Sequence, residues 1–321
     1  MIVITGAAGF IGSNMTGRLN EEGFSDIVLV DDFSSPGKKD NYSGKKFTLK
    51  VHRDEFPEWL ESNHRLVQFV VHLGARTDTA ENDETILNRL NLDYSKKLWT
   101  VCCNYGLPFI YASSAATYGK GDMGYSDNED IVGELNPMNL YGRSKNEFDK
   151  WVLDQENKPW FWAGLKFFNV YGPNEYHKNR MASVVFHAYK SIMATGRMKL
   201  FRSHRPGYPD GEQRRDFVYV GDVTDIIYYM MTKREKPGIY NVGTGEARTF
   251  NDLAKSVFRA AGKEPCIEYI DIPEDIRDKY QYFTRADTGK LRAAGYTKPF
   301  TPLEEGVEKY VKQYLSKESY F

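Results

Sequence analysis

A tyrosine and a lysine stand four residues apart at Tyr141 and Lys145, in the stretch NPMNLYGRSKNEFDKW. This spacing puts both side chains on one face of a helix, one turn apart. A cation about 4 Å from a tyrosine hydroxyl, at an effective dielectric of about 20, supplies the roughly 4 kcal/mol needed to lower its pKa from about 10 to about 7. The pair therefore predicts an acid/base centre that removes the proton of a substrate alcohol while hydride leaves the same carbon.

Neighbouring residues decide which tyrosine is catalytic, because the chain contains 22 tyrosines. The same spacing occurs at Tyr42 and Lys46, at Tyr141 and Lys145, and at Tyr229 and Lys233. Tyr42 lies in a polar stretch and Tyr229 in the apolar run IIYYMM, whereas the run PFIYASS ends in Ser113 and Ser114 ahead of Tyr141. Open α/β folds bind ligands at the carboxyl ends of such strands. We expect Ser114 to hold the reacting oxygen and Ser113 to bond to backbone.

Short apolar runs alternate with amphipathic stretches over residues 1–170. The expected strands are MIVIT, DIVLV, LVQFVVHLGA, PFIYASS and WAGLKFFNV. The expected helices are FIGSNMTGRLNEEG, ETILNRLNLDYSKKLWTVCCNYG and LYGRSKNEFDKWVL. Strand-length apolar runs with helices between them predict a parallel sheet covered on both faces, that is, a Rossmann-type doubly wound α/β fold.

The second half of the chain is less regular and predicts a smaller α/β substrate-binding domain. Its expected helices are MASVVFHAYKSIMATG, FNDLAKSVFRAAG and PLEEGVEKYVKQYL, and residues 202–216 should form a loop. The runs DFVYVGDV and GIYNVGTG are expected to be strands that return to the first sheet. We therefore assign residues 1–170, with returning segments near 217–243, to a dinucleotide-binding domain. Residues 171–216 and 244–321 are assigned to the substrate-binding domain.

The first expected strand runs directly into TGAAGFIG, whose glycines are Gly6, Gly9 and Gly12. Glycines at this strand-to-helix turn let backbone amides approach a pyrophosphate, and the unpaired amides of the helix N-terminus bind the anion. Asp31 ends the next strand, where an acidic residue binds the ribose hydroxyls of NAD. The residues leave NAD and NADP both open, because Asp31 and Asp32 repel a 2′-phosphate while nearby cations could bind it. These cations are Lys38, Lys39 and Arg53.

Composition and charge exclude several classes of protein. The chain has 321 residues, 41% hydrophobic and 27% charged, which excludes a disordered or fibrous protein. A formal net charge of −1 gives no general electrostatic reason to expect nucleic acid or an anionic membrane as partner. Its three cysteines lack metal-ligand spacing, so no metal is expected. Since there is neither a long apolar run nor a basic leader, we expect a soluble cytoplasmic protein.

Three of these motifs, TGAAGFIG, SSAATYG and the Tyr141–Lys145 pair, resemble the extended short-chain dehydrogenase/reductase family. Further stretches narrow the likeness to its nucleotide-sugar epimerases that act at C6 of an ADP-linked heptose. They are FNVYGPNEYHKNRMASVVFH, RRDFVYVGDV, YNVGTG, KYQYFTRAD and LRAAGYTKPF. The resemblance covers nearly the whole chain. It implies an isomerase of lipopolysaccharide heptose synthesis with one tightly bound NADP per subunit, NAD being the alternative, in a cytoplasmic homo-oligomer, namely a pentamer.

The resemblance also implies roles for individual residues. Tyr141 and Lys178 would be the two acid/base residues, with Ser114 and Lys145 in support. Together with the fingerprint, it predicts cofactor contacts at Gly6, Gly9, Phe10, Ile11, Gly12, Asp31, Asp32, Lys38, Arg53, Leu73, Gly74, Ala75, Arg76, Thr77, Asn91, Lys145, Val170 and Lys178. It predicts substrate contacts at Ser114, Asn169, Arg180, His187, Phe201, Arg215 and Tyr280.

The chain departs from the family pattern at three places. Compared with the family that it resembles, the chain has Arg180 in place of a serine and Asp32 in place of a neutral amide side chain. Its 202–214 loop is also longer than in that family. Two of the assigned residues also have structural readings: His187 as a partly buried core histidine, and Arg215 as an ion-pair partner of Asp216.

Two other functions remain as alternatives. The first is an epimerase that acts at C4 of a nucleotide sugar; a 4,6-dehydratase is disfavoured, because Ala115 and Ala116 stand where an Asp-Glu pair belongs. The second is a non-catalytic dinucleotide-binding regulator, which would tolerate loss of Tyr141 or Lys145. Both residues are present, which favours an enzyme.

Overall fold

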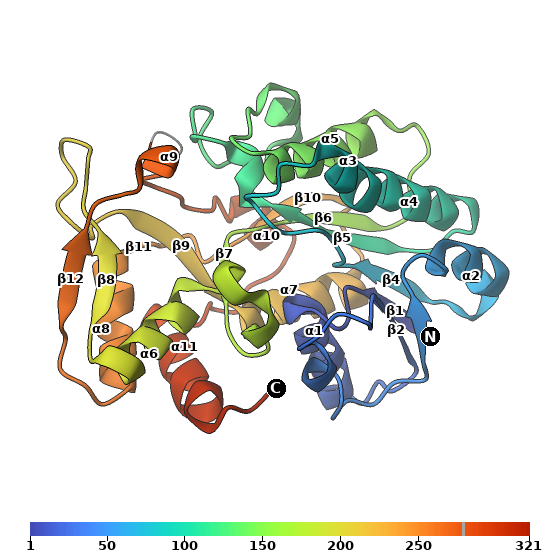
Figure 1. The fold of residues 1–321 in the computed structure, drawn as a ribbon. Helices are drawn as coiled ribbons and strands as arrows, with labels where there is room; N and C mark the ends of the chain where they lie inside the picture. Colours follow the sequence, from blue (N-terminus) through green and yellow to red (C-terminus); the bar gives the residue numbers. More distant parts are fainter. Residues whose placement is uncertain (278–279) are drawn as a thin grey trace.

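The computed structural model describes residues 1–277 and 280–321 and contains a seven-stranded, entirely parallel sheet (Figure 1). The strand order is β10-β6-β5-β4-β1-β2-β3. Their bounds are β1 Ile2–Thr5, β2 Ile27–Asp31, β3 Leu49–His52, β4 Phe69–His72, β5 Phe109–Ser114, β6 Trp162–Phe167 and β10 Gly238–Val242. The chain winds outward in both directions from β1 and β4, which confirms the predicted doubly wound α/β class.

Alternate residues of the central strands enter two separate cores. Ile2 and Ile4 of β1 pack toward α1 (Phe10–Glu21) and α7 (Val220–Lys233). Val3 packs toward the opposite layer. That layer contains α2 Phe56–Asn63, α4 Tyr94–Asn104 and α5 Leu140–Asp154. Short α3 (Glu84–Leu87) joins α4 through a π-helical turn, η3 (Asn88–Asp93). Both faces of the sheet are thus covered, as its continuous apolar strands require.

A second region lies beside the carboxyl ends of the large sheet (Figure 1). It holds a three-stranded sheet of β11 Ala247–Thr249, β9 Arg214–Tyr219 and β7 Asn169–Tyr171, and a pair of β12 Ile267–Ile270 with β8 Met198–Phe201. Its helices include α6 Val184–Thr195, α8 Phe250–Ala260 and α11 Leu303–Lys309, with short α9 Glu274–Arg277. Residues of β7, β8, β9, β12, α6, α8 and α11 share one apolar core. In the described residues no helix is both long and apolar enough to cross a bilayer.

One predicted strand pairing is wrong. The run DFVYVGDV gives β9, but β9 pairs with β7 and β11, and residues 220–233 form helix α7. Residues 214–216 of the predicted loop are the start of β9. β10 does return to the large sheet beside β6, as predicted. An apolar run shows that a strand forms but not which neighbour it will find.

Two neighbouring strands of the large sheet continue directly into the small sheet. β6 ends at Phe167 and β7 begins at Asn169, while β10 ends at Val242 shortly before β11. The amide of Phe168 donates to the carbonyl of Val242 at 3.0 Å, which holds the two crossings together. The carboxylate of Asp216 on β9 accepts the amides of Thr244 at 2.7 Å and of Ala286 at 2.9 Å.

Candidate active site

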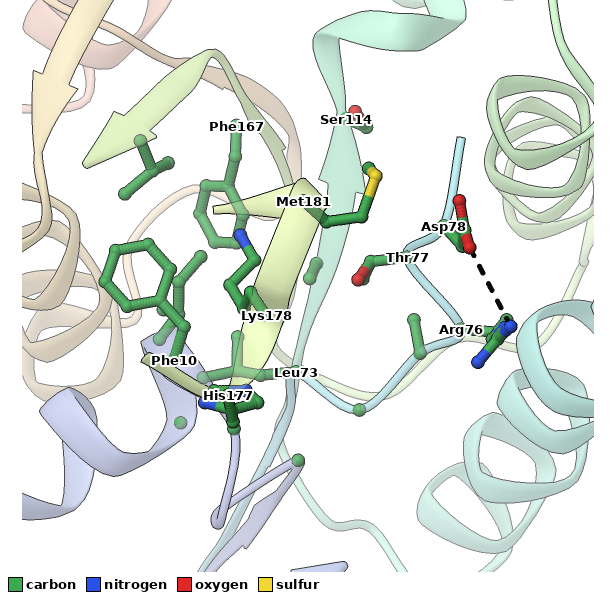
Figure 2. Close-up of a pocket in the computed structure, with 18 of the residues that line it drawn as sticks. Phe10, Leu73, Arg76, Thr77, Asp78, Ser114, Phe167, His177, Lys178 and Met181 are labelled. Carbon is green, nitrogen blue, oxygen red and sulfur yellow. Dashed lines mark ion pairs between the residues drawn. The ribbon is translucent and has the colours of Figure 1, made fainter. Parts of the chain in front are cut away.

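A cavity of about 1180 Å³ opens at the carboxyl ends of the large sheet (Figure 2). Its walls are the glycine turn before α1, the segment after β4, the end of β5, the start of α5 and the stretch from β7 to α6. This is the edge at which doubly wound sheets bind ligands. Nearly all the predicted catalytic and cofactor residues line it, among them Ser114, Tyr141, Lys145, Val170 and Lys178.

The glycine turn fits a dinucleotide. Gly6 has φ +68°, and a Cβ there would lie 2.7 Å from the backbone of Gly74. A Cβ on Gly12 would lie 2.1 Å from the carbonyl oxygen of Gly6, so neither position tolerates a side chain. Gly9 caps α1, and in the described residues no side chain bonds to the first amides of that helix. These amides, from Phe10 onward, are free to bind a pyrophosphate.

The acidic residues beyond this turn are paired with cations. Asp31 accepts hydrogen bonds from the Ala8 amide at 2.9 Å and from Lys38 Nζ at 3.0 Å. Asp32 forms an ion pair with Arg53 at 3.4 Å. Asp31, Asp32, Lys38 and Arg53 all line the cavity. Neither carboxylate therefore acts as an isolated negative charge toward a ligand.

Asn91 lies in the π-helical turn behind the cavity wall, 1% exposed, and is not among the residues that line the cavity. Its side chain accepts the Arg76 amide at 2.8 Å, and its Nδ2 donates to the Arg76 carbonyl and to Ser144 Oγ, both at 3.0 Å. Ser144 Oγ in turn donates to the carbonyl of Tyr141 at 2.8 Å. Asn91 thus ties the predicted cofactor segment Leu73–Thr77 to the helix that carries Tyr141. Direct contact with a cofactor stays a prediction.

A buried histidine that the sequence analysis missed completes this connection. His72, at the end of β4, contacts Thr5 Oγ1 through Nδ1 at 2.7 Å and Ser95 Oγ through Nε2 at 2.9 Å. Because Ser95 donates to the Asn91 carbonyl, its oxygen accepts from His72 Nε2–H, and Thr5 then donates to Nδ1. Thr5 Oγ1 also accepts the amide of Gly74 at 3.0 Å. Burial lowers the pKa of His72 to about 3, so the ring is neutral.

Tyr141 has a raised pKa, contrary to the expectation from its spacing to Lys145. Burial raises the pKa of Tyr141, and a hydrogen bond with Ser114 offsets only part of this effect. Lys145 Nζ donates to the carbonyl of Ala112 at 2.8 Å, and burial lowers the pKa of Lys145 to about 8. Desolvation is therefore the largest influence on the pKa of Tyr141 in this structure, ahead of the hydrogen bond with Ser114.

A fully buried ion pair lies directly behind these residues. Lys166 of β6 and Asp149 of α5 are 3.0 Å apart and have no exposed side-chain surface. Asp149 also accepts from Ser113 Oγ at 2.7 Å and from Tyr111 at 3.0 Å. The expected bond of Ser113 to backbone is therefore wrong, because Asp149 takes its hydroxyl. Asp149 follows Lys145 by one helical turn, a spacing that could have revealed it.

Lys178 lies on η6 (Tyr176–Met181), a 3₁₀ turn rather than the loop expected from its polar sequence. Its Nζ is 5.0 Å from the centroid of the Phe10 ring, and Figure 2 shows the two side chains together in the cavity, with Met181 directed toward Ser114. Burial lowers the pKa of Lys178, and the charge of Glu175 opposes this. Tyr141 and Lys178 thus enter one cavity from different elements.

Two of the predicted substrate residues near η6 also line the cavity, Asn169 and Arg180. Arg180 is exposed and pairs with both carboxylate oxygens of Asp78 at 3.0 and 3.1 Å. His187 is exposed on α6 and is not among the lining residues, so its reading as a buried core histidine is wrong. Its contact with substrate stays a prediction.

The other three predicted substrate residues form a separate cluster. The guanidinium of Arg215 lies 5.4 Å from the ring centroid of Tyr280, which packs edge-on against Phe201 at 5.7 Å. Arg215 donates to the carbonyls of Arg214 and Gln281. In the described chain no ion pair joins Arg215 to Asp216, so that alternative is wrong.

Over residues 1–277 and 280–321, no group of three or more histidine, cysteine or acidic residues is arranged to hold a metal ion.

Comparison with known proteins identifies relatives over nearly the full length. The model of the NAD dependent epimerase/dehydratase family matches residues 2–243. A Fusobacterium nucleatum protein named ADP-L-glycero-D-manno-heptose-6-epimerase is 47% identical over 99% of both chains. The Helicobacter pylori structure of that name is 31% identical, covers 97% of this chain and 95% of its own, and has a TM-score of 0.83. A Thermus thermophilus UDP-glucose 4-epimerase in complex with NAD is 28% identical over 97% of both chains, with a TM-score of 0.75.

Proposed function

Because the chain belongs to the NAD dependent epimerase/dehydratase family, we propose that it interconverts ADP-D-glycero-D-manno-heptose and ADP-L-glycero-D-manno-heptose at C6. It is then an isomerase that supplies the heptose of the lipopolysaccharide core. The observation that carries this proposal is one cavity that combines a dinucleotide cradle with two acid/base side chains, Tyr141 from α5 and Lys178 from η6. The 47% identity to a relative of that name supports the choice of sugar.

The reaction oxidises and then reduces the same carbon. A bound nicotinamide dinucleotide supplies the hydride acceptor and donor, so no net redox change occurs. Ser114 holds the substrate oxygen and Tyr141 takes its proton as the alcohol becomes a ketone. To invert the centre, the ketone must turn its other face to a fixed hydride donor, and its oxygen then points elsewhere. Lys178 serves that second position, because a proton donor must lie within about 2.6–3.2 Å of the oxygen it protonates.

For the cofactor, the proposal is tightly bound NADP, one per subunit, with NAD as the alternative. Lys38 and Arg53 line the cavity and each neutralises one of the carboxylates that would repel a 2′-phosphate. Denaturing the purified protein and identifying the released nucleotide tests both parts. NAD alone would mean that Asp31 and Asp32 outweigh the two cations, and an empty protein would contradict tight binding.

The decisive experiment is to incubate the pure protein with ADP-D-glycero-D-manno-heptose and determine the configuration of C6 by NMR. We expect the L-glycero epimer to form without added cofactor, and Tyr141→Phe provides the background. Inversion of UDP-glucose at C4, without conversion of the heptose, would instead support the C4 epimerase that the Thermus relative suggests. No turnover of either sugar would favour the dinucleotide-binding regulator.

For the assembly, the proposal is a cytoplasmic homo-oligomer, namely a pentamer. Residues 1–170 with α7 and β10 would bind cofactor, and the rest of the chain would bind the nucleotide sugar. Sedimentation of the purified protein tests the subunit number.

A further inference from the structure

Glu175 is a buried carboxylate that the proposed mechanism does not use. Its side chain has no exposed surface. It accepts hydrogen bonds from the amide and from Oγ of Ser183, each at 2.6 Å. Within the described residues no lysine, arginine or histidine approaches it to ion-pair distance. Because an ionised carboxylate without a contact cation is costly to bury, its charge needs another source of stabilisation.

The backbone of η6 places Glu175 beside Lys178. Glu175 caps η6, and the amide of Lys178 donates to the Glu175 carbonyl at 3.0 Å. Side chains three residues apart in a 3₁₀ turn lie over one another. Burial raises the pKa of Glu175 while the Lys178 charge lowers it. Burial likewise lowers the pKa of Lys178 while Glu175 raises it, so each charge stabilises the other.

The other ionisable groups around this pair leave the coupling in place. His177 is adjacent on η6, and burial, with Lys38 nearby, lowers its pKa to about 4, so it is neutral. Tyr310, from the π-helical turn after α11, faces Glu175, and burial raises its pKa, so it too is neutral. Arg180 on η6 is paired with Asp78, and the neighbour of Lys178 from α1 is the uncharged ring of Phe10.

We propose that Glu175 is a positioning residue for the second acid/base group: its buried charge keeps Lys178 protonated, so that Lys178 donates the proton when the ketone is reduced from its other face. This inference rests on the proposed function. In one net turnover Tyr141 gains the proton of the substrate alcohol, and Lys178 Nζ gives a proton to the new alkoxide and becomes a neutral amine. Exchange with solvent then restores both residues.

The experiment compares Glu175→Gln with the unaltered holoenzyme. Glutamine keeps both contacts, because its oxygen accepts from the Ser183 amide and its amide group donates to Ser183 Oγ, but it removes the charge. We expect normal cofactor content and an alkaline limb of kcat/KM displaced to lower pH by about one unit, equally for both C6 epimers. NMR titration of lysines labelled at Cε, with Lys178→Met to assign the signal, should show the same fall in the pKa of Lys178.

Two matched variants separate charge from structure. Ser183→Ala removes a hydrogen bond to Glu175 but leaves the charge, so the alkaline limb should stay in place. Glu175→Asp keeps the charge, so its alkaline limb should lie close to that of the unaltered enzyme. An unchanged limb and an unchanged Lys178 titration in Glu175→Gln would overturn the proposal. If the Lys178 titration moves while activity does not, the charge coupling stands and the two-residue mechanism fails instead.

If Glu175→Gln does not fold, Lys178→Met provides the same test. Loss of the ammonium raises the pKa of Glu175 further above its unfolded value. Ionisation then costs stability as pH rises, so the gap in unfolding free energy between Lys178→Met and the unaltered protein should widen from pH 4.5 to pH 7. A gap that does not change with pH would overturn the proposal.

Discussion

Burial shifts the pKa values of Tyr141 and Lys178 in opposite directions, but both shifts favour the neutral form of the side chain. It raises the pKa of the phenol and lowers that of the ammonium. The proposed mechanism nevertheless needs Tyr141 to accept a proton and Lys178 to donate one. Nearby groups must therefore restore what desolvation removes, Ser114 at Tyr141 and Glu175 at Lys178.

Tyr141→Phe and Lys178→Met should each lower the rate of epimerisation by about 10²–10⁴, or roughly 3–5.5 kcal/mol of barrier. Each removes one proton-transfer group and leaves the dinucleotide cradle intact. The measurement is turnover of both C6 epimers, with cofactor content and the thermal midpoint as controls. Near-normal turnover by Lys178→Met would mean that Tyr141 serves both faces of the ketone.

Arg215→Ala should weaken binding of the ADP-sugar by roughly 1.5–3 kcal/mol, the value of a charge-assisted hydrogen bond, without loss of cofactor. Arg215→Lys is the matched control, since it keeps the charge but loses the planar guanidinium. Calorimetric titration of both variants measures the effect. If affinity is unchanged and only the thermal midpoint falls, then Arg215 serves to hold the Gln281 carbonyl.

The sequence predicts those cavity residues that local spacing identifies, such as the glycine turn, Ser114, Tyr141 and Lys145, although the lowered pKa expected of Tyr141 from that spacing is wrong. It does not predict His72 and Lys166, whose partners come from distant segments. Thr5 and His72 are 67 residues apart, and the spacing of Asp149 from Lys145 on α5 does not indicate that Lys166 on β6 is the partner of Asp149. Such buried pairs depend on which strands become neighbours, and the order of the strands in the sheet cannot be derived from a single sequence.

Periodicity likewise predicts the long elements better than the short ones. α1, α5, α6 and α8 follow their amphipathic patterns closely. The sequence does not predict β3, because this edge strand buries only Val51 and so lacks a continuous apolar run. Edge strands are stabilised by the neighbour they pair with, here β2, more than by their own side chains.

β4 delivers a neutral histidine to the core, and this should make the protein sensitive to acid. The pKa of His72 is about 3 in the folded state and about 6.5 in the unfolded chain. Below pH 6.5 His72 is protonated in the unfolded state but stays neutral in the folded state, so stability falls as pH falls. From pH 6.5 to pH 5 the unfolding free energy should drop by about 1.6 kcal/mol from this residue.

Urea unfolding at several pH values tests the effect of His72, with His72→Asn as the comparison. The asparagine side chain can still accept a hydrogen bond from Thr5. His177 also has a lowered pKa, but it is present in both proteins, so its contribution cancels in the comparison. The variant should be less stable at pH 7 but should lose less stability on acidification. Equal slopes in the two proteins would contradict the assignment.

In the molecule as a whole, η6 and the segment after β4 meet across the cavity through Arg180 and Asp78. Arg180 is largely exposed, so the pair should contribute about 0.2–1 kcal/mol. Arg180→Ala should therefore speed release of bound ADP-sugar by no more than about fivefold. Asp78→Asn should do the same, the double variant should add nothing, and about 0.5 M salt should remove the difference. Stopped-flow displacement measures these rates, and additive effects would show that the two side chains act separately.

The crossings of β6 and β10 into the small sheet limit the motion of the two sheets relative to each other. A hinge between the two sheets would have to bend the chain at Phe168 and after Val242 together, and Asp216 holds the second crossing through the amide of Thr244. The two sheets should therefore fluctuate as one rigid body, and their crossing amides should exchange with deuterium far more slowly than those of η6. Entry of a nucleotide sugar would then depend on movement of η6 and residues 73–79, so the gate and the proposed proton donor Lys178 would lie on the same short turn.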